Sequence, residues 1–251
     1  MRRPSARTTA SRRLVATILV CLAGSALAGC TATPSDCNPY YPLRRGARWV
    51  FHDTRQTPNV TMERTVTVAS VETSGRLTTA TLSQNVHAVG QPETSAGSAT
   101  TTVRCAGGAV QLSVEGAAES SAGGQAANAT VRAELPGLPP ADKLTPGYQW
   151  QSEGRVETTD GGTKVVTAIS RQSQVDGVFP VKVPGGEFSQ ALRVASVETL
   201  KLGERQAKQE IREWYVRGLG LVKRDTQLTE VHRPVGSVEE LVSFSGLQPE
   251  P

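Results

Sequence analysis

Aromatic residues are scarce in this chain: 4% of its 251 residues are Phe, Trp or Tyr. Proteins that bind sugars or nucleobases use aromatic side chains as stacking platforms, so this scarcity argues against both classes. Histidine is rarer still: the chain has three, scattered along its length. None of them has the spacing of a metal ligand relative to the four cysteines. The sequence therefore predicts no metal site.

Patterns that support catalysis or nucleotide binding are also missing. No G-x-S-x-G turn presents a nucleophilic serine, and no glycine-rich loop leads into a helix as a phosphate-binding loop does. His52 and Asp53 are adjacent, so on a strand they face opposite ways and make a poor acid–base pair. His87 and His232 are isolated. We therefore expect no catalytic residues, no cofactor and no enzymatic activity, and an exported hydrolase is the least favoured alternative.

Long apolar runs are absent apart from one short stretch near the start. Residues 14–23 are apolar but too few to cross a bilayer comfortably, and five arginines precede them. A basic segment, a short apolar segment and then small residues are typical of an export signal. The sequence thus predicts a chain that leaves the cytoplasm.

Leu27-Ala28-Gly29-Cys30 ends this stretch and resembles the lipobox of bacterial lipoproteins. The resemblance implies cleavage before Cys30, diacylation of its thiol, and a lipid anchor on the outer face of the cytoplasmic membrane or on an outer membrane. Thr31 is not the aspartate that retains such proteins at the inner membrane, so both membranes stay open. The alternative is an ordinary secretory signal cut after Ala28 or Gly29, with Cys30 present by chance.

The basic character of the whole chain comes from this leader. The formal net charge is +4, but residues 1–29 hold five arginines and no acidic residue. Removing those five from the 27 basic side chains leaves 22 against 23 acidic ones. No lysine–arginine cluster remains that would follow a phosphate backbone, so we expect no nucleic-acid partner.

Two cysteines remain once Cys21 leaves with the leader and Cys30 serves as the lipid site. Cys37 and Cys105 form an even pair in an exported chain, for which a disulfide is the default. That bond would close a loop of about 68 residues and contribute on the order of 4 kcal/mol to stability. Two unpaired buried thiols are the alternative.

Short segments with period-2 alternation and many Thr and Val residues dominate from residue 40 onward, which predicts antiparallel sheet. Glycine-rich turns separate several of them, as at 106–108, 160–162 and 216–220. Residues 203–213 contain good helix formers and stay ambiguous, although the flanking β character favours a strand pair. The clearest strands are Thr61–Glu72, Arg76–Val86, Val103–Cys105, Val110–Val114, Thr163–Ser170, Val178–Val183, Ala191–Leu200, Ile211–Arg217 and Leu221–Val231.

Two matched landmarks indicate an internal duplication. Gly46-Ala47-Arg48-Trp49 corresponds to Gly147-Tyr148-Gln149-Trp150, with both tryptophans at equivalent core positions, and residues 103–110 resemble residues 216–222. Residues 116–146 are rich in Ala, Gly, Ser and Pro and predict a mobile linker. The expected organisation is a signal peptide (1–29), a lipidated tether (30–39), a first β unit (40–115), this linker (116–146), a second β unit (147–246) and a tail (247–251).

Three motifs carry a further resemblance: Tyr41-Pro42-Leu43 with Gly46–Trp49, the step Val183-Pro184-Gly185-Gly186-Glu187-Phe188, and the segment 213–223. They resemble TapB-type and related domains of unknown function in bacterial envelope lipoproteins, which are similar in architecture to the LolA/LppX group. The resemblance implies an all-β fold with little helix, in which a curved antiparallel sheet forms a half-barrel or clam-like sheet over an apolar concavity. It carries over no catalytic residue. We expect Trp214 and Tyr215 to build the fold, and a ligand-binding role for either of them is the alternative.

Two functions fit these observations. The favoured one is a non-enzymatic, membrane-anchored lipoprotein of the cell envelope whose curved sheet binds or carries an apolar ligand such as a lipid. The alternative is a structural or interaction module of a pilus or envelope complex, in which a sheet edge or the loops at 90–99 and 116–128 contact a protein partner. A carrier needs an open apolar cavity, whereas an interaction module needs a filled core and an exposed patch or edge.

Overall fold

A computed structural model of the chain describes residues 37–56, 59–91, 97–120, 127–135, 137–160, 162–229 and 235–250. These residues belong to one compact unit, Asp36–Pro251. The leader and Cys30 lie outside the described residues. Within the described part of the chain, no helix is long and apolar enough to span a membrane.

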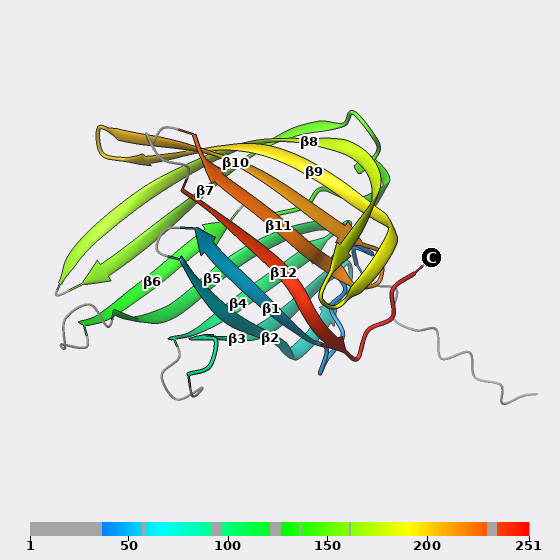
Figure 1. Cartoon of the computed structure of the whole chain (residues 1–251), viewed down its shortest axis with the longest axis horizontal. Helices are drawn as coiled ribbons and strands as arrows, with labels where there is room; N and C mark the ends of the chain where they lie inside the picture. Colours follow the sequence, from blue (N-terminus) through cyan, green and yellow to red (C-terminus); the bar gives the residue numbers. More distant parts are fainter. Residues whose placement is uncertain are drawn as a thin grey trace, which may run out of the picture. The chain divides into compact units, whose positions relative to one another are not determined.

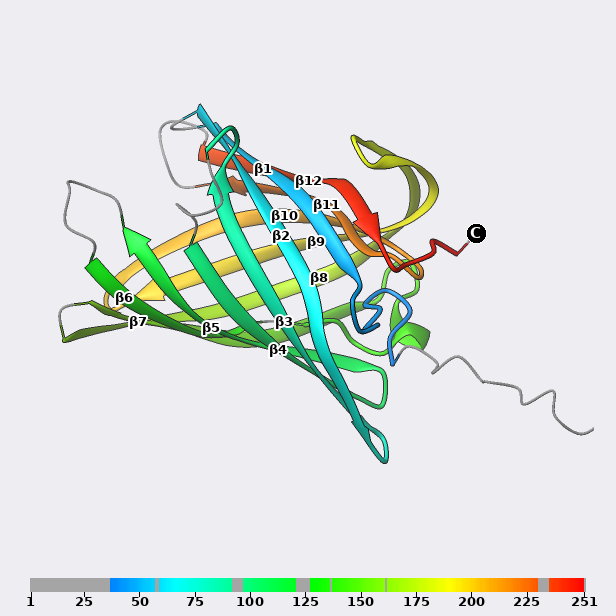
Figure 2. The same cartoon turned by 90° about the horizontal axis from the view of Figure 1, so that it is seen from below.

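The described residues form twelve antiparallel strands joined edge to edge in one closed barrel (Figures 1 and 2). Each strand pairs with its neighbours in the chain, and β12 pairs with β1. A short 3-10 helix, η2 (Ala141–Lys143), lies between β6 and β7. The strands are β1 (Arg48–Gln56), β2 (Asn59–Ser74), β3 (Leu77–Ala88), β4 (Gly97–Ala106), β5 (Ala109–Ser120), β6 (Ala127–Leu135), β7 (Gln149–Asp160), β8 (Thr163–Val183), β9 (Gly186–Leu202), β10 (Arg205–Val216), β11 (Gly220–Leu228) and β12 (Val235–Ser245).

The all-β, antiparallel character with little helix is confirmed, but the sheet closes where a half-barrel was expected. The ladder between β1 and β12 runs from Arg48↔Ser245 to Arg55↔Ser237, and a shorter seam joins β6 to β7. Closure gives the first and last strands a partner on both sides, which removes the exposed N–H and C=O rows of an open sheet. Alternation in a sequence indicates which residues face inward but not which strands meet, so it could not distinguish a bent open sheet from a ring.

The barrel consists of two six-strand halves that begin in the same way. Gly46, with φ +80°, donates its N–H to the carbonyl of Val68. Gly147, with φ +86°, donates its N–H to the carbonyl of Val175. Both glycines use a backbone conformation that other residues rarely adopt, and each lies two residues before the first strand of its half. The halves β1–β6 and β7–β12 thus start with matched contacts, and the internal duplication stays a prediction.

Part of the predicted linker is strand. β5 runs on to Ser120 and β6 occupies Ala127–Leu135, so the first half extends well beyond residue 115. Ladders to β5 on one side and to β7 on the other order residues 130–134, although their neighbourhood is rich in Ala, Gly and Ser. Residues 203–213 contain a turn and most of β10, as the flanking β character favoured.

The segments at 37–47 and 137–148 form a plug at one end of the barrel (Figure 2). Cys37 forms the predicted disulfide with Cys105 of β4. The buried side chain of Asn38 donates to the carbonyls of Gly108 at 2.8 Å and Pro139 at 3.0 Å. Apolar side chains around this end form much of the core and include Leu43, Val103, Leu144, Leu192, Leu219 and Val222.

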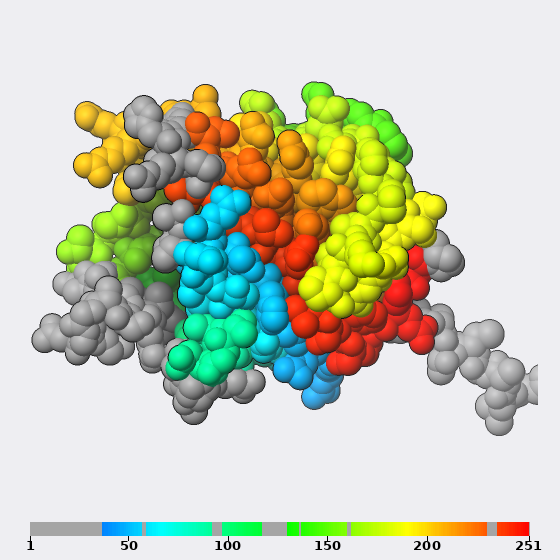
Figure 3. Space-filling model, in the orientation of Figure 1, coloured from blue at the N-terminus to red at the C-terminus, as the bar shows by residue number. Residues whose placement is uncertain are grey.

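The β8–β9 hairpin bends back onto β12 (Figure 3). The N–H of Gly185 donates to the carbonyl of Leu241 at 2.8 Å. A Cβ at position 185 would lie 3.0 Å from that oxygen, so glycine permits the close approach. The glycine-rich step at 184–186 therefore serves a tertiary contact as well as the hairpin.

Candidate functional site

A cavity of about 580 Å³ lies inside the barrel. This volume is in the range of small-molecule sites. Side chains from both halves line it, and the plug contributes Tyr41, Pro42 and Leu138. Burial raises the pKa of Tyr41 to about 12, so its hydroxyl is protonated at neutral pH.

Corresponding positions in the two halves can be matched through the strand registers. In the first half, cross-strand neighbours lead from Val68 through Leu82 to Thr101 on β4. The same route in the second half leads from Val175 through Val194 to Glu213 on β10. The next neighbours differ in chemistry between the halves: the rows are Thr101–Val114–Ala133 on β4–β6 and Glu213–Arg224–Glu239 on β10–β12.

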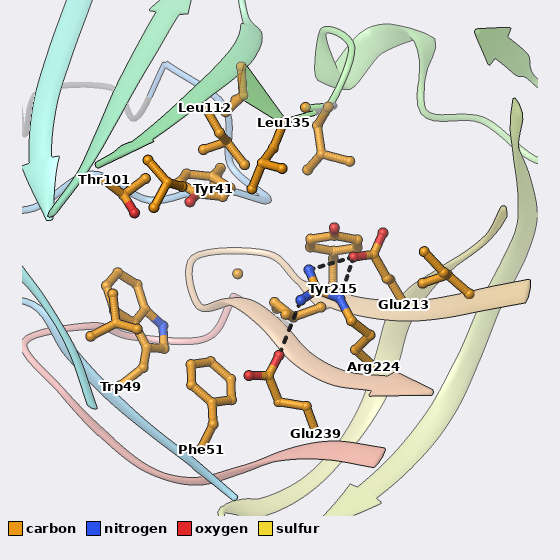
Figure 4. A pocket seen from close by; sticks show the side chains of 18 of the residues that line it. Tyr41, Trp49, Phe51, Thr101, Leu112, Leu135, Glu213, Tyr215, Arg224 and Glu239 are labelled. Atoms are coloured by element: carbon orange, nitrogen blue, oxygen red, sulfur yellow. Dashed lines mark hydrogen bonds and ion pairs between the residues drawn. The ribbon is translucent and has the colours of Figure 1, made fainter. Parts of the chain in front are cut away.

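This divergence gives the cavity one apolar wall and one charged wall. Leu112 and Leu135 lie on one side, and the chain of Glu213, Arg224 and Glu239 lies on the other (Figure 4). Buried charges are rare in proteins unless they are paired. The charged wall therefore depends on the geometry of its ion pairs.

Arg224 is the centre of the charged wall. Its guanidinium lies 2.7 Å from Glu213 and 3.3 Å from Glu239. The other partner of Glu239 is Arg64 of β2, whose Nε–H donates to Oε1 at 2.7 Å. Arg64 also lies over the ring of Phe51, with its Cζ atom 4.7 Å from the ring centroid. Because Phe51 is on β1, this contact carries the network across the β12–β1 closure.

The network continues on the other side of Arg224. Arg171 of β8 lies 3.7 Å from Glu213 and 2.7 Å from Glu198 of β9. Glu198 also accepts a hydrogen bond from the side chain of Gln209 at 2.6 Å. Three arginines and three glutamates are thus joined in one chain of alternating charge, and their formal charges cancel.

The pKa values of this network follow from burial and opposite charge. Burial alone would raise the pKa of Glu213, but Arg224 and Arg171 lower it. Burial likewise opposes ionisation of Glu239, and the positive charges of Arg64 and Arg224 lower its pKa. The two carboxylates raise the pKa of Arg224 against the opposing effect of burial. These side chains are therefore charged at neutral pH.

The structure places the two aromatic residues of the closing motif differently. Tyr215 is buried and lines the cavity, where burial and the nearby Glu213 raise its pKa. Trp214 is only partly buried, and the Lys223 ammonium lies 5.9 Å from its ring centroid. Trp214 therefore builds the sheet, as expected, whereas Tyr215 belongs to both the core and the cavity wall.

The predicted core tryptophans also differ. Trp49 is buried and its indole N–H donates to the carbonyl of Leu219 at 2.7 Å. Trp150 lines the cavity and stacks on Tyr148 with the ring centroids 5.9 Å apart. Among the described residues, its indole N–H has no hydrogen-bond partner. Both tryptophans line the cavity, so the equivalence expected from sequence holds for their place in the two halves but not for the hydrogen bonding of their indole groups.

The histidines are less isolated than their spacing indicated. Glu63 of β2 lies 3.3 Å from Nε2 of His52 on β1 and 3.7 Å from Nε2 of His87 on β3. Asp53 lines the cavity instead, so the adjacent His52 and Asp53 do not form an acid–base pair. In the described ranges, no group of three His, Cys, Asp or Glu side chains could hold a metal ion. His232 lies outside the described residues.

Sequence reasoning missed the charged wall, although a signal for it was present. Glu213 lies between Ile211 and Tyr215 at the same strand parity, and these two flanking residues face inward. A charged residue at an inward position of an alternating strand is unusual. Arg171 shows the same pattern between the buried Ile169 and Ser173.

No family model matches this chain, and no curated protein matches its sequence. The resemblance to TapB-type lipoproteins therefore stays a prediction. Two crystal structures share the fold, each at 15% sequence identity over the whole of its own chain. One is a protein of Bacteroides fragilis, provisionally described as exported with a YmcC-like fold, which covers 83% of this chain with a TM-score of 0.61. The other is a protein of Parabacteroides distasonis, provisionally described as a lipoprotein, which covers 84% with a TM-score of 0.59.

Proposed function

We propose that this chain is a non-enzymatic, lipid-anchored protein of the cell envelope that binds an amphipathic small molecule inside its barrel. The observation that carries the proposal is the cavity of about 580 Å³ with one apolar and one charged wall. An apolar ligand, as the sequence predicts, would account for the apolar wall alone. A ligand that also carries a polar group would contact the apolar wall with its apolar part and the charged wall with its polar group.

The anchoring part of the proposal rests on the lipobox-like segment before Cys30. It is supported by the fold shared with proteins provisionally described as exported and as a lipoprotein. Cys30→Ser should leave the chain unprocessed or without its acyl chains, as intact-mass measurement would detect. Normal processing and detergent-dependent release of the Cys30→Ser variant would remove the anchor from the proposal.

Residues 31–251 provide a form for binding experiments without detergent. They contain every described strand, the plug and the Cys37–Cys105 disulfide. This form should be exported to a periplasm, purified and measured by native mass spectrometry, and we expect a reproducible added mass that matches an amphiphile. An apo mass that does not change after incubation with lipid extract would oppose the proposal.

A variant that fills the cavity tests where the ligand sits. Val114→Trp places a large side chain on the apolar wall, whereas Gln111→Trp on the same strand places it at an exposed position. The first variant should lose the added mass and the second should keep it. If both keep it, the ligand binds outside the barrel.

The interaction-module alternative loses one of its supports. Because β1 and β12 pair with each other, the barrel does not offer the first or last strand of the sheet as a free edge for a partner strand. A partner would have to use the loops, and parts of the predicted contact loops at 90–99 and 116–128 lie outside the described residues. The cavity therefore favours ligand binding over this alternative.

A further inference from the structure

The charged wall does not present its two signs equally to the cavity. The exposed fractions of the Arg224 and Arg64 side chains are 38% and 22%, whereas those of Glu213 and Glu239 are 3% and 9%. Arg171 lines the cavity, but its partner Glu198 does not. On this wall the guanidinium groups are therefore more exposed than the carboxylates of Glu213 and Glu239, which also line the cavity, so the wall offers a ligand more N–H donors than carboxylate oxygens.

Arg224 has donor capacity left over. A guanidinium carries five N–H bonds. Nε and Nη2 are directed at Glu213, at 2.8 and 2.7 Å, and Nη1 is directed at Glu239 at 3.3 Å. These contacts use one N–H on each nitrogen, which leaves one more on each terminal nitrogen. Each of these two N–H bonds can donate to an oxygen of a carboxylate or a phosphate, the anions that guanidinium groups bind best.

We infer that the polar group of the ligand is an oxyanion, a carboxylate or a phosphate on an apolar chain, and that Arg224 binds it. This inference rests on the proposed function, because it names the chemistry of the ligand of the same cavity. The position of Arg224 in the second half corresponds to Val114 in the first half. The ligand's chain then extends toward Val114, Leu112 and Leu135, while its oxygens accept hydrogen bonds from Arg224.

The buried carboxylates keep the site selective. The pKa of Glu213 and that of Glu239 are both lowered, so they stay ionised and hold the guanidinium in place. A cationic ligand would have to displace an arginine from these carboxylates, and an uncharged one would leave the extra N–H bonds without an anionic acceptor. The wall therefore discriminates by the sign of the ligand's charge, although its own charges cancel.

The test uses residues 31–251 and four probes with the same sixteen-carbon chain. They are hexadecanoic acid, palmitoyl lysophosphatidic acid, hexadecanol and hexadecylamine, each measured by displacement of the uncharged fluorescent probe N-phenyl-1-naphthylamine. We expect at least one oxyanion to bind about tenfold more tightly than hexadecanol, since hydrogen bonds to charged groups are worth that much. The acid and the phosphate arms tell the two possible head groups apart. Equal or tighter binding of hexadecanol or hexadecylamine would overturn the inference while leaving the proposed function in place.

A matched pair of variants then assigns the selectivity to Arg224. Arg224→Met with Glu213→Gln removes one positive and one negative charge and keeps the Arg64–Glu239 and Arg171–Glu198 pairs. The control, Arg193→Met with Asp176→Asn, removes an ion pair of 2.9 Å between two side chains that do not line the cavity. The first double variant should bind the oxyanion no more tightly than hexadecanol, with its affinity for hexadecanol unchanged. The control should leave both affinities unchanged. If the first variant fails to fold by circular dichroism, Arg224→Lys serves instead, with a smaller loss expected because it keeps the charge but loses the fork.

The outcomes separate the two proposals. If no probe displaces the reporter and the reporter itself does not bind, the proposed function fails and the inference fails with it. If all probes bind alike and the Arg224 variant matches its control, only the oxyanion inference fails.

Discussion

The disulfide between Cys37 and Cys105 gives the most direct quantitative test of the plug. The two residues are 68 positions apart, and closing a loop of that length removes about 4 kcal/mol of conformational entropy from the unfolded chain in the loop-entropy model. Reduction keeps both sulfur atoms in place, so it avoids the cavity that substitution of the fully buried Cys105 would create. We therefore expect reduction to lower the free energy of unfolding by about 4 kcal/mol and the Tm by roughly 10 °C.

The assay is urea-induced unfolding of residues 31–251, followed by tryptophan fluorescence, with and without a phosphine reductant. This form has no cysteines besides Cys37 and Cys105, because Cys21 and Cys30 precede it. Mass spectrometry after alkylation counts the thiols in each sample, so that incomplete reduction is recognised. An unchanged urea midpoint in a sample with both cysteines alkylated would refute the reasoning. Alkylation of both residues without reductant would show that the bond does not form in the protein.

Three further predictions concern the cavity walls. Arg224→Met alone should destabilise the fold by about 3–5 kcal/mol in urea unfolding, because it strands buried carboxylates, and adding Glu213→Gln should recover much of that loss. The pKa of Glu213 is lower in the folded than in the unfolded protein, so its ionised side chain stabilises the fold above the unfolded pKa of about 4.3, and this stabilisation disappears as the pH falls through the lower folded pKa. The wild-type protein should therefore lose stability in that pH range, and the double variant should lose less. Trp49→Phe should cost about 1–3 kcal/mol through its buried hydrogen bond, whereas Trp150→Phe should cost less than about 1 kcal/mol; equal losses would contradict the asymmetry of the two halves.

Strand positions were predictable because alternation is a local property. Thr61–Glu72 lies within β2, and Ile211–Arg217 covers the end of β10. In Thr61–Glu72, β-branched residues alternate with polar ones, and that pattern fits a sheet with two unlike faces. Ile211–Arg217 is recognised instead by its β-branched and aromatic residues. The glycine-rich turn at 106–108 ends β4 and begins the link to β5 for an equally local reason, since Gly107 and Gly108 both have positive φ.

Features that depend on pairing were not predictable in the same way. β6 (Ala127–Leu135) has a composition typical of a linker, and its order comes from neighbours supplied by two other strands. Closure of the ring depends on β12 meeting β1, which are nearly two hundred residues apart in the chain. Local sequence patterns carry no information about contacts between distant strands. They therefore predict a curved sheet but not whether its first and last strands pair.

The candidate site lies between these two cases. The alternation of the sequence indicates that each charged residue of the wall faces inward, but the residue that neutralises its charge always lies on another strand. Glu213, Arg224 and Glu239 become one unit only through the registers of β10, β11 and β12. A charged residue at an inward position predicts an oppositely charged partner, and the pairing register of the strands identifies that partner.

The difference between the two halves of the barrel also explains why opposite sides of the cavity differ in polarity. If the halves had kept the same side chains at corresponding positions, a bound amphiphile would have met the same wall at either end and could lie in two opposite orientations. Instead, Val114 in one half corresponds to Arg224 in the other, and Ala133 corresponds to Glu239. Polar groups gain nothing from an apolar wall, and apolar chains leave the guanidinium donors without an acceptor, so the two orientations differ in free energy. For the amphipathic ligand that we propose, this difference between corresponding strands is what would let the cavity distinguish the head of the ligand from its tail.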